Sequence, residues 1–170
     1  LLAYGYYSGE NVTMINEGRL AFLRTPDSKF NLANFMKVNL YTSLGAVKLG
    51  LDILLKDEGV KLDRIMGHGG FFKTKEVGQR YLSAAVGAPV TVMDTASEGG
   101  AWGIALLAAY LADKKEDEKL EDYLDKRIFA RLSGVSIEAD KEDIEGFDKF
   151  MERYVAGLEV EKAAIEAMKW

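Results

Sequence analysis

Residues 63–70 read Asp-Arg-Ile-Met-Gly-His-Gly-Gly, and they open the part of the chain that decides the fold. A segment with helical character follows as far as Val86, and a short apolar run, Val-Thr-Val-Met, occupies residues 90–93. A second glycine-rich stretch, Ser-Glu-Gly-Gly-Ala-Trp-Gly at residues 97–103, begins a segment rich in alanine and leucine. This order predicts strand, glycine turn, helix, strand, glycine turn and helix. Strands that alternate with helices favour an α/β fold with a parallel sheet.

Both glycine turns fall where such a sheet binds its ligands, at the carboxyl ends of the strands. Gly67, Gly69 and Gly70 lack a Cβ, so the backbone there can approach a phosphate or another anion closely. The glycines of residues 99–103 would let a helix start close to the sheet or to a nucleotide. The alternative is that both clusters only make tight turns and close packing. Neither G-x-G-x-x-G nor G-x-x-x-x-G-K-[ST] occurs, but two corresponding turns together favour nucleotide binding more than either one alone.

The order of these motifs resembles the carboxy-terminal domain of the FGGY carbohydrate kinases, and within that family it is most similar to the xylulose kinases. Those proteins carry a glycine loop, commonly Gly-Gly-Gly-Ala, that contacts the nucleotide, and later a Glu-x-Gly-Ala-x-Gly-Ala-Ala helix start. Here residues 67–70 match the loop and residues 98–105 match the helix start. Similar segments at residues 7–10, 17–19 and 145–147 extend the resemblance over most of the chain.

The resemblance implies both a fold and an activity. The fold is α/β, the carboxy-terminal half of a ribonuclease H-like (actin, hexokinase and sugar kinase) ATPase domain with a sheet flanked by helices. The activity is transfer of the γ-phosphoryl group of ATP, with Mg²⁺, to a sugar hydroxyl. The sugar that the resemblance favours is D-xylulose, which would give xylulose 5-phosphate. The nucleotide contacts that the family pattern assigns are Gly67, Gly69, Gly70, Thr74, Glu98 and Gly100.

Some residues depart from the family pattern or have a second explanation. His68 stands where glycine is usual, and we interpret it as a simple loop residue. Phe71 and Phe72 replace alanine and a small polar residue; they could stack on adenine, but we favour a place in the core. Thr74 is a plausible N-cap of the next helix as well as a nucleotide contact. The helix dipole alone can explain Glu98, which follows a predicted cap.

The family's remaining catalytic parts are missing from the sequence. The amino-terminal domain of these kinases supplies an Asp-x-Gly-Thr phosphate turn and most of the sugar site, and their catalytic aspartate lies near the domain junction. No Asp-x-Gly-Thr occurs here, so we assign no catalytic residue and no metal ligand. We expect the chain to be inactive without that domain. The alternative is a non-catalytic kinase-like domain that serves in assembly or regulation, supported by His68 and the Phe71–Phe72 pair. An α/β hydrolase ranks last, because no G-x-S-x-G occurs.

Composition restricts the class of protein further. The 170 residues suit a single domain, with residues 113–170 as a charged linker and helical cladding. A net charge of −5 without a basic cluster argues against a nucleic-acid binder. The chain lacks cysteine, which excludes disulfides and fits a cytoplasmic protein, and we find neither a signal peptide nor an apolar run long enough to span a membrane. It begins Leu-Leu-Ala, and we expect a fragment of a longer protein or one chain of a split one; the oligomeric state stays open, a homodimer included.

Flanking segments carry weaker predictions. Residues 12–15 and 20–23 are typical of two strands joined in a hairpin. Asn31 is expected to cap a long helix over residues 32–58, which Gly59 ends. The core-facing stripe of that helix is predicted to be Met36, Leu40, Leu44, Val47, Leu51 and Leu54.

The carboxy-terminal part is predicted to be helical. Helical periodicity returns at residues 120–128 within a charged segment. Asp140 is expected to cap a further helix that Gly157 interrupts, leaving a short final helix over residues 160–168.

Overall fold

The computed structural model of the chain describes residues 1–93, 99–131 and 133–169. It divides into two compact units, each described by itself. The first unit comprises residues 1–62, 84–87 and 139–170. The second unit comprises residues 63–83 and 88–138.

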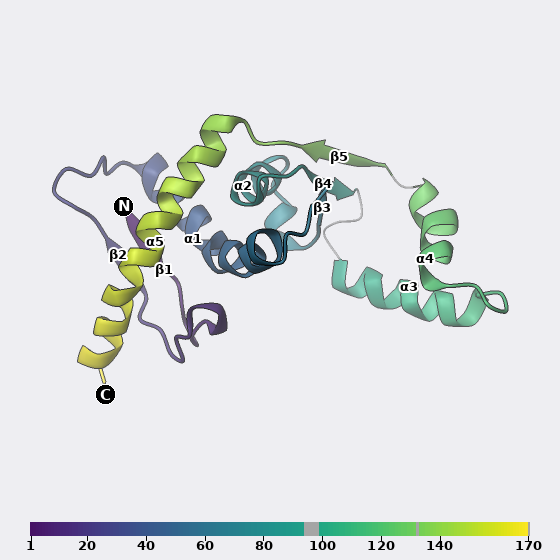
Figure 1. Cartoon of the computed structure of the whole chain (residues 1–170), viewed down its shortest axis with the longest axis horizontal. Helices are drawn as coiled ribbons and strands as arrows, with labels where there is room; N and C mark the ends of the chain where they lie inside the picture. The colour runs from purple at the N-terminus through teal and green to yellow at the C-terminus, as the bar shows by residue number, and fades with distance from the viewer. Residues whose placement is uncertain (94–98, 132, 170) are drawn as a thin grey trace. The chain divides into compact units, whose positions relative to one another are not determined.

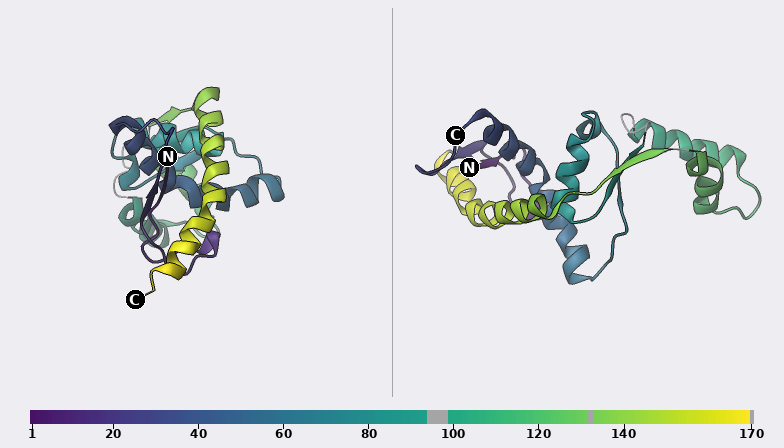
Figure 2. Two further views of the ribbon diagram at one scale, coloured as in Figure 1. Left: turned by 90° about the vertical axis from the view of Figure 1, so that its left-hand side faces the viewer. Right: turned by 90° about the horizontal axis from the view of Figure 1, so that it is seen from above.

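The first unit combines a small sheet with two long helices. Strands β1 (Leu2–Tyr4) and β2 (Ala21–Leu23) pair antiparallel. Helix α1 (Leu32–Asp52) ends in a π-helical turn (Ile53–Asp57), and both α1 and β1 contact α5 (Lys141–Ala167). Figure 2 shows the yellow helix α5 beside the purple amino-terminal strand.

Local signals at the helix ends are confirmed. The Asn31 side chain accepts a 2.8 Å hydrogen bond from the Asn34 N–H, as an N-cap does. Asp140 caps α5 in the same way through the Asp143 N–H, also at 2.8 Å. Gly59 adopts a left-handed backbone with φ 64°, as predicted for a residue that follows a helix.

Aromatic side chains fill the core of the first unit. Tyr4, Phe147 and Tyr154 are fully or almost fully buried. The Tyr41 and Phe147 rings meet edge to face with centroids 4.8 Å apart, an arrangement that aromatic pairs prefer. The Tyr4 hydroxyl donates a 2.7 Å hydrogen bond to the Tyr154 carbonyl and so joins β1 to α5.

Two predictions for this unit are wrong. The hairpin does not form: Asn11–Thr13 is a 3₁₀ turn, and β2 pairs with β1 instead. The predicted stripe of α1 also has the wrong phase, because α1 is apolar on more than one face. Among its members Leu44 is buried, whereas Met36, Val47 and Leu54 are about half exposed. The buried residues of α1 are Val38, Tyr41, Leu44, Gly45 and Lys48.

Close packing explains why α5 is continuous where a break at Gly157 was predicted. Any Cβ at Gly157 would collide with the Tyr4 hydroxyl, so this glycine makes room for β1 and leaves the helix intact. Glycine lowers helix stability by only about 1 kcal/mol relative to alanine, a cost that tertiary packing can exceed.

One expectation about membranes needs correction. Residues 32–57 form a helix that is long and apolar enough to cross a membrane by length and composition. Core helices pass the same test, and α1 packs on β1 and α5. Its buried Lys48 pairs with Asp52 at 2.8 Å. One face of α1, formed by its buried residues, therefore contributes to the core of the first unit.

The second unit is built on a three-stranded sheet in the order β3-β4-β5 (Figure 1). Strands β3 (Ile65–Gly67) and β4 (Val90–Met93) are parallel, as predicted, and helix α2 (Val77–Val86) lies between them in sequence. Strand β5 (Gly134–Ile137) was not predicted and pairs antiparallel with β4. The buried Gln79 side chain of α2 donates to the carbonyls of Val90 and Val135, at 3.0 and 2.7 Å.

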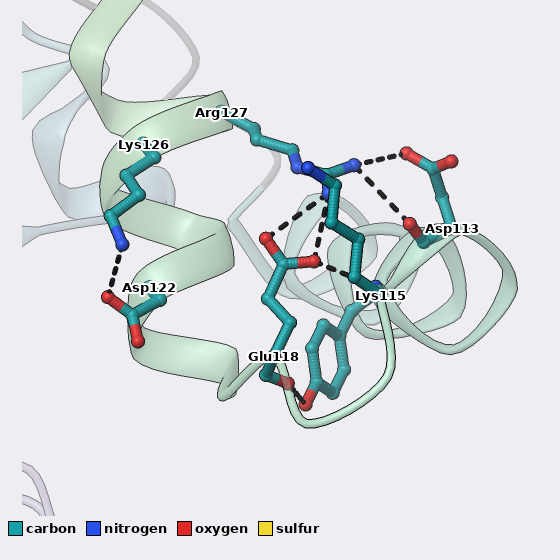
Figure 3. A network of polar contacts seen from close by, with 7 residues as sticks. Asp113, Lys115, Glu118, Asp122, Lys126 and Arg127 are labelled. Carbon is teal, nitrogen blue, oxygen red and sulfur yellow. Dashed lines mark hydrogen bonds and ion pairs between the residues drawn. The ribbon is translucent and has the colours of Figure 1, made fainter.

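The rest of the second unit is helical, and the periodicity at residues 120–128 is confirmed. Its elements are α3 (Gly99–Asp113), α4 (Leu120–Tyr123), a π-helical turn (Leu124–Ile128) and a 3₁₀ turn (Phe129–Arg131). Figure 3 shows how charges join them: Arg127 pairs with Asp113 at 2.8 Å and with Glu118 at 2.9 Å. This charged segment is therefore tied back onto the end of α3.

Candidate functional site

The first glycine turn begins where β3 ends, and its first glycine serves packing. Gly67 is buried, and a Cβ there would lie 2.7 Å from the Phe72 ring. Phe71 and Phe72 are partly buried, with their rings edge to face and 5.4 Å apart. This arrangement agrees with a core role for Phe72. It also gives Gly67 a reason to be glycine that needs no ligand.

The next two glycines differ, because both border open space. Gly69 has φ 99°, a conformation that favours glycine, and a Cβ on Gly69 or Gly70 would meet no atom within 4 Å. Within the described residues, neither N–H group donates a hydrogen bond to a protein acceptor. Two backbone N–H donors beside open space are what an anion requires.

The structure brings the second glycine turn against the first. Gly99, the first residue of α3, lies so close to His68 that an added Cβ would stand 2.7 Å from the His68 Cβ. The Trp102 ring stacks on the His68 ring, with centroids 5.9 Å apart and planes 20° apart. Phe129 meets the Trp102 ring at 6.2 Å. The two motifs, far apart in the sequence, therefore meet at His68.

His68 carries a second notable feature, a buried polar atom without a partner. Its Nδ1 atom is buried and makes no hydrogen bond in the described part of the chain. Buried polar atoms in proteins are almost always hydrogen-bonded, so an orphan marks a place where a ligand or water would bind favourably. The sequence had suggested only a simple loop histidine. The surroundings of His68 depend on how α3 packs against the turn, which the sequence does not specify.

The start of α3 leaves room for a ligand. A Cβ added to Gly100 or Gly103 would meet nothing within 4 Å. Ser97 and Glu98, the predicted cap and nucleotide contact of this helix, lie outside the described residues.

Thr74 does not cap helix α2. The helix begins at Val77, and Glu76 before it has a left-handed backbone with φ 67°. The sequence was misleading because a 3₁₀ turn (Gly70–Phe72) takes up the residues after the glycines. Thr74 is exposed, and its hydroxyl has no hydrogen-bond partner among the residues that the structure describes.

The two glycine turns present groups that could bind a ligand. Within residues 1–93, 99–131 and 133–169, no group of three or more His, Asp and Glu side chains could hold a metal ion. What the turns offer is backbone N–H groups, an unpaired imidazole nitrogen and glycines beside open space. These groups suit an anionic ligand such as a nucleotide phosphate.

The fold of this chain resembles that of a solved kinase structure. The solved structure of ligand-bound xylulose kinase from Lactobacillus acidophilus matches 92% of this chain with a TM-score of 0.62 and 14% sequence identity. The likeness confirms the predicted α/β fold of the actin/hexokinase-like class. This chain spans 29% of that kinase. No curated protein sequence matches the chain. The model of the C-terminal domain of the FGGY family of carbohydrate kinases matches residues 1–112, and the chain therefore belongs to the FGGY family.

Proposed function

We propose that this chain is the ATP-binding portion of a carbohydrate kinase, which transfers the γ-phosphoryl group of ATP to a sugar hydroxyl. The observation that carries the proposal is the contact between His68 and Gly99, which joins the two glycine motifs of the family. Gly69, Gly70 and Gly100 border open space beside this contact, so a ligand can approach the backbone there.

The proposed nucleotide contacts divide into three groups by what supports them. Gly69 and Gly70 would donate their N–H groups to phosphate or ribose oxygens, and Gly100 would let the start of α3 close the other side. Gly67 would contribute by allowing the turn to form, and would not contact the nucleotide itself, because Phe72 fills the space beside it. Glu98 and Thr74 rest on the family pattern alone.

The proposed reaction forms one phosphorus–oxygen bond and breaks another. The acceptor oxygen of the sugar forms a bond to the γ-phosphorus, the bond from that phosphorus to the β,γ-bridging oxygen breaks, and ADP leaves. Catalysis of such a transfer is mainly positioning and charge stabilisation, with Mg²⁺ arriving on the nucleotide. The hydroxyl proton needs a base, and we propose that the amino-terminal domain supplies it together with the sugar site. D-xylulose is the substrate that the resemblance to xylulose kinases favours.

A missing partner domain also agrees with the surface of α3. Ile104 and Leu111 are more than two-thirds exposed, and Leu107 is about half exposed. These side chains recur at helical spacing and would form an apolar stripe for a partner to cover. We propose that the amino-terminal kinase domain packs there in a complete cytoplasmic enzyme. Alone, the chain should bind nucleotide weakly and catalyse nothing.

The test is an assay of ADP release with D-xylulose and MgATP, comparing the complete parent protein with this chain. The proposal predicts sugar-dependent ADP release from the parent protein and none from the chain alone. Sugar-dependent ADP release by the isolated chain would disprove the proposal that the amino-terminal domain supplies the base and the sugar site. A parent protein that binds MgATP but releases no ADP with any pentulose, hexulose or polyol would disprove the kinase activity.

A second function is favoured by one specific observation. The His68 and Trp102 rings stack where the two glycine turns meet, and His68 stands where the family loop usually has glycine. A domain that had lost nucleotide binding and served in assembly or regulation would show such a filled turn. Replacing His68 with glycine separates the two functions: nucleotide affinity that appears only in His68→Gly supports the non-catalytic domain.

A further inference from the structure

A wide pocket of about 890 Å³ opens in the first unit, which does not contain the glycine turns. Its walls come from the end of β2, the loop at residues 24–31, the first turns of α1 and the middle of α5. The volume lies within the range of small-molecule sites, roughly 300–1,000 Å³.

Positive charge dominates the walls of this pocket. The cationic side chains that line it are Arg24, Lys29, Lys37, Lys149 and Arg153. Asp27 is the one carboxylate among its described lining residues. The chain as a whole has a net charge of −5, so this concentration of cations runs against the general balance. A cluster of like charges repels itself and is stabilised by a bound counter-charge.

Most of these cations have no carboxylate partner. Within the described residues, Arg24, Lys29, Lys149 and Arg153 form no ion pair. Other lysines on α5 do: Lys162, for instance, pairs with Glu159 at 2.8 Å. Arg24, Lys29, Lys149 and Arg153 are therefore available to a ligand.

Aromatic rings lie beneath two of the cations. The Arg24 guanidinium lies over the Phe30 ring, and the Lys37 ammonium lies over the Tyr41 ring, each 5.1 Å from the ring centroid. Such contacts limit side-chain freedom and leave the charge intact, which lowers the entropic cost of binding an anion.

The single carboxylate is itself engaged locally. Its hydrogen bond with Thr25 and its own backbone N–H hold the pKa of Asp27 below its usual range, and Arg153 adds to the effect. Asp27 therefore stays ionised, yet it is far outnumbered by cations. The pocket keeps an excess of positive charge.

We propose that this pocket binds a small polyanion of the phosphate class, a compound with two or more phosphate groups. Arginine and lysine are the side chains that recognise phosphate, the first with a planar fork and the second as a point charge. Several cations around one pocket match several phosphate charges, whereas a single carboxylate would leave most of them uncompensated. The site does not depend on the proposed kinase activity, because its residues belong to the first unit.

The test is calorimetric titration of the 170-residue chain with inorganic pyrophosphate in the absence of magnesium. The proposal predicts saturable binding that Lys149→Gln/Arg153→Gln weakens by about tenfold or more, since the variant loses charge-assisted hydrogen bonds to phosphate. The matched control is Lys141→Gln/Lys162→Gln, which removes the same charge from the same helix outside the pocket. Its affinity should change by less than about twofold, because exposed charges beyond a Debye length are screened.

Two further variants distinguish binding in this pocket from binding at the glycine turn. Arg24→Gln/Lys29→Gln changes the loop and should weaken pyrophosphate binding in the same way as the pair on α5. Gly70→Val changes the glycine turn of the second unit and should leave pyrophosphate binding intact. Absence of saturable binding, an equal loss in the control pair, or a loss confined to Gly70→Val would each overturn the proposal.

Discussion

Gly99 and His68 are in direct contact, so close that a Cβ on Gly99 would stand 2.7 Å from the His68 Cβ. Gly99→Ala should therefore push the imidazole away and disturb its stack on Trp102. We expect a loss of about 1–3 kcal/mol in the free energy of unfolding, as overpacking typically costs. Urea unfolding followed by tryptophan fluorescence measures it. The control is Gly100→Ala, where a Cβ meets open space; equal destabilisation of both variants would contradict the contact.

Gly45 and Gly50 of α1 offer a matched pair in the first unit. A Cβ on Gly45 would lie 2.6 Å from the Tyr154 ring, whereas one on Gly50 would come no closer than 3.8 Å, to Val12. Gly45→Ala should destabilise the chain by about 1–3 kcal/mol. Gly50→Ala should stabilise it by up to about 1 kcal/mol through helix propensity. Thermal unfolding followed by circular dichroism tests the difference, and shifts of the same sign in both variants would disprove the packing of α1 on α5.

The buried tyrosines of the first unit predict loss of stability in alkali. Burial, with smaller effects from Tyr6 and Glu161, raises the pKa of Tyr4 to about 12. Burial also raises the pKa of Tyr6 and of Tyr154. In the unfolded chain these phenols lose their protons near pH 10, whereas the folded chain still holds them. The contribution of these tyrosines to the free energy of unfolding is therefore fully present below pH 10. It is lost as the pH rises towards 12.

Urea unfolding at increasing pH checks this slope. Tyr154→Phe removes one of the three raised groups and the contact between the Tyr6 and Tyr154 hydroxyls. It should cost roughly 1 kcal/mol at neutral pH and make the alkaline slope shallower. Tyr7→Phe changes an 81% exposed residue and should leave both unchanged. An unchanged slope in Tyr154→Phe would contradict the assignment.

The charge network of Figure 3 should order residues 113–128. Arg127 contacts Asp113 and Glu118, and it also lies 4.9 Å from the centroid of the Tyr123 ring. Arg127→Ala should lower hydrogen-exchange protection of this segment several-fold, because it removes two ion pairs and a cation–π contact at once. Lys126→Ala breaks only an exposed pair with Asp122 and should leave protection almost unchanged. Equal effects would argue against the network.

Local signals in the sequence predicted local structure well. The caps Asn31 and Asp140 needed only their own helix starts, and the parallel pairing of β3 with β4 followed from the order of strands and helices. The meeting of the two glycine turns was implied by that order too. The contact of His68 with Gly99 was not, because it depends on where α3 lies.

Long-range packing decided what the sequence could not show. β2 pairs with β1 across the intervening turn, and no pattern within residues 12–23 specifies that partner. Apolar residues occur all around α1, so its sequence alone does not determine which face is buried. The buried face is the one that packs against Tyr154 and its neighbours. Gly157 reads as a helix breaker in isolation and becomes a packing position only beside Tyr4.

The most direct test of nucleotide binding is calorimetric titration of the chain with MgATP and MgADP, comparing Gly70→Val with Gly5→Val. Both glycines border open space without a left-handed backbone, but only Gly70 lies in the proposed turn. We predict weak saturable binding that Gly70→Val abolishes and Gly5→Val preserves. Binding that survives in Gly70→Val would contradict the proposed site. Absence of binding even to the complete parent protein would contradict nucleotide binding altogether.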